Sequence, residues 1–369
     1  MTNRILPLLA MFMSFSYATT VLAQDADSLE IANRGTLTIS GSGDIYYRYD
    51  MIGKTKGNNY TSFTNSHNAF ELGMASAKLE YNYRGLGICA DLGFGKRAME
   101  FSYNDVPMVA AIKQLYMFYQ PKDFIKITAG SWGTHVGYEL LDPHLNANYS
   151  MSYMFTNGPF FHTGLKFEFF KGPHTFMVGV ANPTDFKYST GALDNKVGLA
   201  QYSVVVNPHL SIYLNYVGGQ ALDTTLSNQI DLVLSSAVTD EISLGFNGTV
   251  NLVSDLPLKR ASVTRNVWHG QAIYFKYMPK PWAGLAVRLE HFGDPDQLKV
   301  LSSAIAGGSV FEATLSANFK VYGLTVIPEF RFDGSNQKIF TDKDGAGTNF
   351  NASFVVAAIY NFSVQPKLR

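Results

Sequence analysis

Apolar and polar residues alternate along much of this chain. Between residues 37 and 51 the odd positions are mostly apolar, whereas the even positions are mostly polar or charged. The same period of two continues through residues 86–94, 311–321, 324–332 and 350–362. Successive side chains of a β-strand point to opposite faces, so each run predicts a strand with one apolar and one polar face.

One predicted strand changes phase along its length. Within residues 70–83 the apolar positions shift between Met74 and Ala77. An extra residue in one strand of an antiparallel pair produces such a shift, so we expect a β-bulge there. Residues 109–134 are partly apolar on both faces, and their register stays open.

Two kinds of connection alternate between the predicted strands. Short clusters of Gly, Pro, Asn or Asp, typical of tight hairpins, occur near residues 84–85, 121–123, 171–173, 207–209, 239–240, 279–281 and 322–323. Longer polar segments occur near residues 52–67, 97–108, 135–159, 183–196, 220–227, 253–265, 294–308 and 334–347. These connections predict an all-β fold of about sixteen strands. The predicted fold is a transmembrane antiparallel β-barrel with short periplasmic turns and long extracellular loops.

A secreted soluble β-sandwich or solenoid would also alternate in this way. Such folds seldom place so many aromatic residues at strand ends, and the sequence contains no repeat of fixed length. An aromatic girdle belongs at the two membrane interfaces of a barrel. Its expected members are Tyr47, Tyr49, Phe330, Phe332, Tyr360 and Phe362.

Residues 1–23 predict a secretory signal peptide. Arg4 precedes an apolar stretch at residues 5–15, and small residues follow up to Ala23, after which we expect cleavage. Pro7 and several Ser and Thr residues make a permanent membrane helix the weaker alternative. Residues 24–369 then form a single barrel domain. They contain no other apolar run of about 18 residues, so any membrane-spanning part must be β.

Composition narrows the function further. Only 16% of the residues are charged, as expected if half of the strand positions face lipid. Lys plus Arg and Asp plus Glu both number 29, so a basic nucleic-acid binder is excluded. The single Cys89 excludes a disulfide framework and cysteine-built metal sites. We therefore expect no nucleic-acid partner and no cofactor.

Residues 112–166 resemble the beta-barrel porin-2 family, outer-membrane proteins found largely in the Bacteroidota. The motif GTHVGYE at residues 133–139 and the segment from Asn148 to Gly164 carry most of the resemblance. It implies a porin in the bacterial outer membrane, in contact with lipid and lipopolysaccharide and folded by the barrel-assembly machinery. Sixteen-stranded porins are commonly homotrimers. Outer-membrane barrels usually end in an aromatic residue, whereas here Phe362 is followed by seven more residues.

The polar faces of the strands predict which charged residues line the lumen. A barrel of 16–18 strands leaves room for an aqueous channel. By phase, the pore-lining residues are Asp44, Arg48, Lys166, Glu168, Asp231, Arg288, Glu290, Glu312, Lys320, Glu329 and Arg331. Five are basic and six are acidic, which predicts weak ion selectivity. The alternative for each residue is an inward ion pair that stiffens the wall without contacting solute.

The third long segment, residues 135–159, is expected to fold inward and narrow the pore. Glu139 and Asp142 would project into the constriction, with Asn146 and Asn148 as hydrogen-bonding neighbours. The alternative is a loop that caps the barrel or packs on its neighbours through apolar residues. Those residues are Leu140, Leu141, Tyr149, Tyr153 and Phe155.

Other chemistry is poorly supported. His135 and His144 could join the two loop carboxylates in a metal site, but loop hydrogen bonding is favoured over metal binding. Asp342-Lys343-Asp344-Gly345 lacks the closing bidentate Glu of a calcium loop, so a hairpin loop is favoured. No nucleophile elbow marks a hydrolase. The sequence thus predicts a non-enzymatic passive channel for small hydrophilic solutes, with a plugged structural or adhesive barrel as the alternative.

Overall fold

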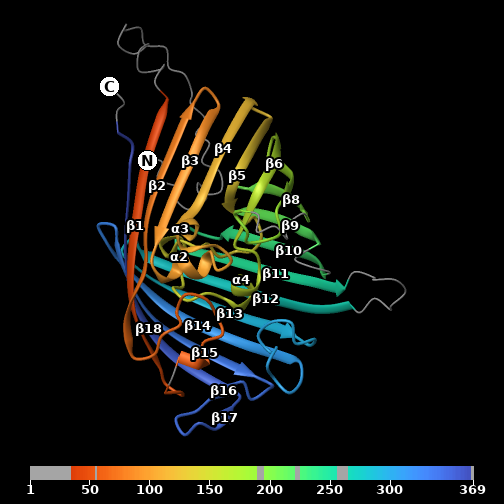
Figure 1. The fold of residues 1–369 in the computed structure, drawn as a ribbon. Helices are drawn as coiled ribbons and strands as arrows, with labels where there is room; N and C mark the ends of the chain where they lie inside the picture. The colour runs from red at the N-terminus through yellow and green to blue at the C-terminus, as the bar shows by residue number, and fades with distance from the viewer. Residues whose placement is uncertain (1–34, 55, 189–194, 221–224, 256–264, 367–369) are drawn as a thin grey trace.

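The computed structural model describes residues 35–54, 56–188, 195–220, 225–255 and 265–366. The predicted signal peptide lies outside these residues. Figure 1 shows long strands arranged around short helices. The helices are α2 (Lys96–Phe101), α3 (Pro107–Ala110) and α4 (Tyr153–Asn157), and two 3₁₀ turns, η1 and η2, span Lys56–Asn58 and Pro143–Leu145. Among the described residues, no helix has the length and apolar character needed to cross a membrane.

Sixteen antiparallel strands close into one barrel, as the sequence predicted. They are β1 (Thr36–Asp50), β2 (Ala69–Tyr83), β3 (Leu86–Phe94), β4 (Ile112–Lys122), β5 (Ile125–Gly133), β6 (Phe161–Lys171), β7 (His174–Ala181), β8 (Val197–Asn207), β9 (Leu210–Gln220), β10 (Thr225–Ala237), β11 (Ile242–Asp255), β12 (Arg265–Lys280), β13 (Ala283–Asp294), β14 (Gly308–Val321), β15 (Leu324–Ser335) and β18 (Phe350–Val364). A small hairpin, β16 (Phe340–Thr341) with β17 (Gly347–Thr348), lies in the last loop. Each strand pairs with the next in sequence, and β18 closes the ring on β1. Closure leaves no strand edge exposed to lipid.

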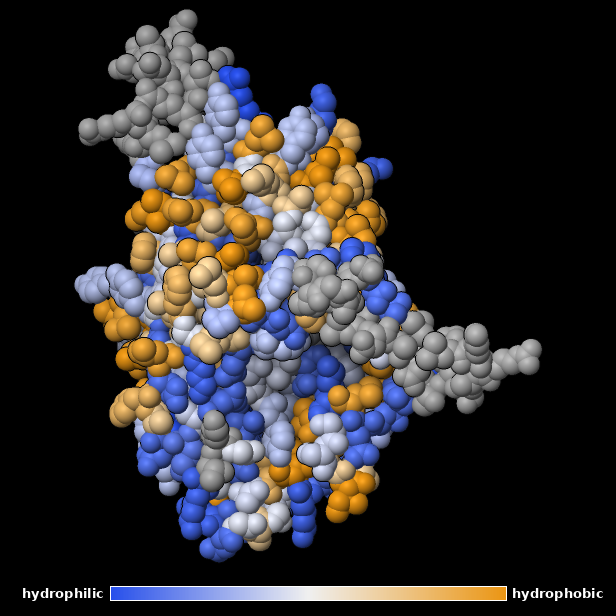
Figure 2. Space-filling model, viewed as in Figure 1, coloured by the Kyte–Doolittle hydropathy of each residue, from blue (hydrophilic) through white to orange (hydrophobic). Residues whose placement is uncertain are grey.

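The alternation places apolar side chains outside and polar side chains inside. On β14, Phe311 and Leu315 are exposed on the outer surface, whereas Glu312, Thr314 and Ser316 are buried inside. Figure 2 shows apolar side chains gathered over the strands in the upper part of the view, with hydrophilic residues below. In a bilayer this outer surface faces hydrocarbon, so burial in lipid replaces burial in a protein core.

The predicted bulge in β2 is confirmed, but it lies at Gly73 and Met74, just before the predicted position. The register against β1 shifts between Gly43 and Ile45, where one residue of β1 faces two of β2. The backbone N–H of Met74 donates to Asp44 Oδ1 at 3.0 Å, and Met74 points inside the barrel. A Cβ on Gly73 would clash with the Asp44 carboxylate, so a larger residue here would require that carboxylate to move.

A charge on the outer surface is expected to destabilise the barrel. Leu315→Lys places an ammonium in lipid and should cost about 2–4 kcal/mol of unfolding free energy, measured by urea titration in lipid vesicles. Ser235→Lys on β10 is the control, because this position faces the lumen and is partly exposed. Equal losses in the two variants would contradict the assignment of the outer face.

Candidate functional site: the third loop inside the barrel

The connection between β5 and β6, residues 134–160, lies inside the barrel and is called here the third loop. Its polar groups bond to inward side chains of β1, β4, β10, β13, β14 and β15. Figure 1 shows its helix, α4, within the frame of strands. A loop enclosed in this way must find partners for its backbone amides, because water is largely excluded.

Two carboxylates of the wall each bind two successive amides of the third loop. Glu329 on β15 accepts from the N–H groups of Tyr149 and Ser150, at 2.7 and 3.0 Å. Glu290 on β13 accepts from the N–H groups of Tyr153 and Met154, both at 2.7 Å.

The second of these pairs opens α4. The first amides of a helix lack intrahelical partners and favour negative charge, so Glu290 caps the helix from the opposite wall. Ser152 completes the cap, because its side chain accepts from the backbone N–H of Phe155.

A third carboxylate does the same at the end of the third loop. Asp185, in the connection between β7 and β8, accepts from the N–H groups of Phe160 and Phe161 at 2.7 and 3.0 Å. Asp185 is fully enclosed, and burial raises the pKa of its carboxyl to about 6. Sequence reasoning missed this residue, because nothing in its local sequence indicates its partners.

Two arginines connect the same wall to loop carbonyls. Arg288 on β13 forms ion pairs with Glu139 of the third loop and with Glu312 on β14, and it donates to Ser150 O at 2.7 Å. Arg331 on β15 donates to Met151 O at 2.6 Å. Burying a guanidinium is costly unless its donors are satisfied, and here wall and loop share that task.

Arg331 is itself held by an acidic neighbour. It pairs with Asp333, whose Oδ1 also accepts from the Tyr153 hydroxyl at 2.9 Å. The guanidinium carbon of Arg331 lies 5.0 Å from the centre of the Tyr153 ring. The side chain of Tyr153 is therefore held at both its hydroxyl and its ring face.

Tyr149 fixes the third loop against the seam of the barrel. Its hydroxyl donates to Asp44 Oδ2 at 2.5 Å. Its ring packs on an apolar inner patch formed by Tyr46, Ile327, Val355, Ala357 and Ile359. Apolar side chains on the lumen side would be unfavourable beside water, and the loop covers them.

The connections between β1 and β2 and between β3 and β4 pack against the third loop. Phe63, Phe101, Met151, Phe160 and Phe161 form a buried cluster from three connections and the start of β6. The guanidinium of Arg97 on α2 lies over the rings of Phe63 and Tyr149, 4.7 and 5.1 Å from their centres. These loops are thus one packed body rather than independent surface loops.

The residues predicted to form the constriction are placed in the lumen but are bonded to other residues. Glu139 pairs with Arg288, and Asp142 pairs with Lys113 on β4 at 2.6 Å. Asn148 donates to Ser316 Oγ at 2.7 Å. The side chain of Asn146 bonds to the backbone N–H and carbonyl of Leu140 within the loop. The packing role weighed as the alternative therefore coexists with the inward position.

The charged residues predicted to line the pore differ from expectation in their exposure. All face inward, but eight of the eleven are buried: Asp44, Arg48, Asp231, Arg288, Glu290, Glu312, Glu329 and Arg331. The expectation that these eight contact channel water needs correction, because loops and neighbouring side chains cover them. Lys166 and Glu168 are partly exposed, and Lys320 is exposed.

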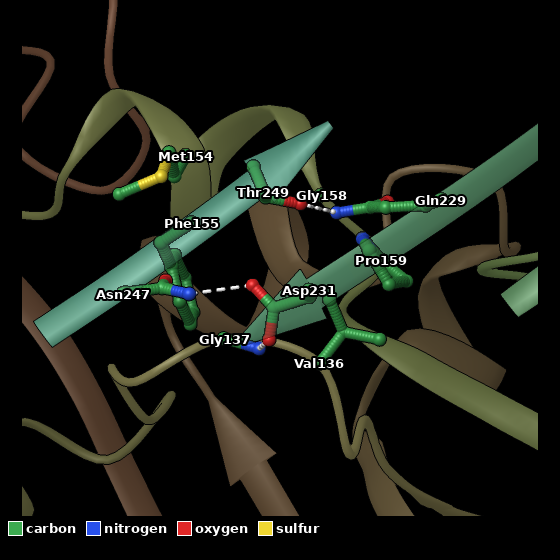
Figure 3. A pocket seen from close by; sticks show the side chains of 10 residues that line it. All are labelled: Val136, Gly137, Met154, Phe155, Gly158, Pro159, Gln229, Asp231, Asn247 and Thr249. Carbon is green, nitrogen blue, oxygen red and sulfur yellow. Dashed lines mark hydrogen bonds between the residues drawn. The ribbon is translucent and has the colours of Figure 1, made fainter. Parts of the chain in front are cut away.

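Against β10 and β11 the third loop makes fewer bonds. Gly137 N donates to Asp231 Oδ1 at 3.0 Å. A cavity of about 10 Å³ lies between the loop and the wall, and its lining includes Gln229, Asn247 and Thr249. This is room for about one water molecule. Figure 3 shows the side chains around the cavity. Amides and hydroxyls dominate the wall here, bonded to one another as in the pairs Ser227–Asn251 and Gln229–Thr249.

The weak metal candidates stay unsupported. Among the described residues, no group of three or more His, Cys, Asp or Glu side chains could hold a metal ion. His135 Nε2 lies 3.0 Å from the carbonyl oxygen of Tyr216, a hydrogen bond within the loop and wall. Residues 342–345 form the turn of the β16–β17 hairpin, where Asp342 Oδ1 accepts from the N–H groups of Asp344 and Ala346.

One protein family matches nearly the whole chain. The family described as "Putative beta-barrel porin-2, OmpL-like" matches residues 36–362. The chain belongs to this porin family. No curated protein sequence matches the chain.

Solved structures agree with this porin in fold. OmpT of Vibrio cholerae, expressed in the outer membrane, is 11% identical with a TM-score of 0.56, over 93% of this chain and 100% of that one. The anion-selective porin from Comamonas acidovorans is 10% identical with a TM-score of 0.60, covering 89% and 100%. The outer-membrane channel DcaP of Acinetobacter baumannii is 11% identical with a TM-score of 0.60, covering 89% and 98%. Together with its family membership, this fold makes this porin an outer-membrane protein.

Removing one wall carboxylate should release one pair of loop amides. In Glu290→Gln the amides of Tyr153 and Met154 should exchange with deuterium at least about tenfold faster, because a neutral amide accepts more weakly than a carboxylate. The amides of Tyr149 and Ser150 should change little, since Glu329 still holds them. Glu241→Gln, in the exposed turn after β10, is the control. Uniform acceleration over the loop would contradict separate anchoring.

Lowering the pH should reduce the stability of the folded protein through His135. Burial lowers the pKa of this imidazole to about 4, so between pH 6.5 and 4 the unfolded chain binds a proton that the folded chain does not. The stability that neutral His135 contributes is present above pH 6.5 and is lost as the pH falls. His135→Gln should therefore be less destabilised, relative to the native chain, at pH 4.5 than at pH 7.5 in urea titrations. If the stability difference between His135→Gln and the native chain were the same at both pH values, burial would not lower the pKa of His135.

Proposed function

We propose that this porin is a passive diffusion channel for small hydrophilic solutes, with a bore restricted by the third loop. The observation that carries the proposal is a closed sixteen-strand barrel with residues 134–160 bonded inside it. Family membership and fold support a channel rather than an enzyme. Solutes would pass along β10 and β11, where amides and hydroxyls line the inner wall beside the small cavity at Gly137.

Ion selectivity in the middle of the lumen should be weak. The buried charges there are used within the protein, as in Glu139–Arg288–Glu312, Arg331–Asp333 and Asp142–Lys113. Solvent-excluded groups already paired with donors bind passing ions less readily than exposed charges. A trimer is also part of this proposal, since one structure of OmpT, an outer membrane protein of Vibrio cholerae, is described as a trimer form.

The second candidate is a plugged structural or adhesive barrel. The small cavity at Gly137 and the burial of the central side chains favour it. Liposome swelling separates the two functions: a channel gives rates that fall with solute size, whereas a plugged barrel gives none. Swelling equal to that of protein-free liposomes would contradict the channel.

Loosening the third loop should widen the channel. The double variant Glu290→Gln/Glu329→Gln removes both carboxylates that bind loop amide pairs, so single-channel conductance should rise about twofold or more. Asp344→Asn, in the exposed β16–β17 hairpin, is the control and should conduct as the native chain does. Unchanged conductance in the folded double variant would show that the third loop does not restrict flow.

A further inference from the structure

Several charged side chains at the end of the lumen near the short turns remain open to water. On the half nearer the short turns, the inward and unburied ones are Lys78, Glu80, Lys126, Lys166, Glu168, Lys276 and Lys320. Their phase is set by neighbours on the outer face, such as the exposed Leu79, Phe275 and Phe319. Lys320 lies only two residues before the turn at Tyr322.

These residues do not share the balance of the whole chain. Five are lysines and two are glutamates, and each glutamate pairs with a lysine on its own strand. Lys78 Nζ lies 3.0 Å from Glu80 Oε1, and Lys166 Nζ lies 3.5 Å from Glu168 Oε1. The end of the lumen near the short turns is therefore net positive.

Lys276 and Lys320 differ from the other lysines of this group. Neither forms an ion pair with a carboxylate among the residues that the structure describes. Their strands, β12 and β14, both pair with β13, so the two lysines lie on one side of the wall. A narrow vestibule with low-dielectric walls concentrates ions opposite in sign to its exposed charge.

The acidic excess farther inside has a different environment. Glu290, Glu329 and Asp231 are buried, and each accepts two or more hydrogen bonds. Their charge is partly offset by these donors and is not in contact with channel water. The exposed lysines therefore have the larger influence on which ions enter.

We propose that this channel prefers small anions. The lysines at the end of the lumen near the short turns, above all Lys276 and Lys320, set this preference. The inference rests on the proposed diffusion channel and specifies its solutes. Sequence phase alone gave a near-equal number of acidic and basic residues. The difference arises for two reasons. Five of the six predicted acidic residues are buried, and the prediction by phase left out Lys78, Lys126 and Lys276.

The test is the reversal potential in planar bilayers across a KCl gradient, with the full-length purified porin. The reversal potential of the native channel should be shifted toward the equilibrium potential of chloride. Lys276→Gln/Lys320→Gln should lower the chloride-to-potassium permeability ratio about twofold or more. Lys276→Arg/Lys320→Arg should keep the ratio, and Lys343→Gln in the exposed hairpin is the control.

Each outcome is decisive for one claim. A reversal potential at zero, or one shifted toward the equilibrium potential of potassium, would overturn the anion preference. A shift toward potassium would also show that the buried carboxylates dominate. An unchanged ratio in the folded glutamine variant would overturn the role of the two lysines. Complete absence of conductance in the native protein would instead contradict the diffusion channel itself.

Discussion

The structure depends on one constraint: polar backbone groups inside a barrel must find partners where water is scarce. The strands satisfy theirs through the closed ladder. The third loop satisfies many of its own through carboxylates that bind amides in pairs, namely Glu329, Glu290 and Asp185. Because these bonds join the loop to opposite parts of the molecule, the fold of the loop and the shape of the barrel determine each other.

The same constraint explains why an inner wall carries so many charged residues. Arg288 and Arg331 donate to loop carbonyls while pairing with Glu139, Glu312 and Asp333. Truncating one member of such a network leaves the others buried without partners, which is far costlier than the net value of the pair. These residues belong to the architecture first, and they affect permeation through the position of the third loop.

Much of the fold could be predicted because lipid and water impose a period of two. The sixteen strands, the alternation of turns and loops and the bulge in β2 all follow from local patterns. The inward phase of Glu329 was equally clear, but its partners lie 180 and 179 residues away. No local pattern encodes that pairing, so burial of the predicted pore-lining charges could not be foreseen. Lys276 was missed because the run around it is apolar on both faces.

The central claim is that the third loop lies in the lumen, and cross-linking of introduced cysteines tests it most directly. In a Cys89→Ser background, cysteines at Ala147 and Asn318 should be joined by a short thiol-specific cross-linker, because Asn318 Nδ2 donates to Ala147 O at 2.9 Å. Ala317, the neighbouring position on β14, faces the outside and should not cross-link to residue 147. Efficient joining of 147 to 318 alone is the predicted result. Equal joining at both positions, or none at either, would contradict an inward loop.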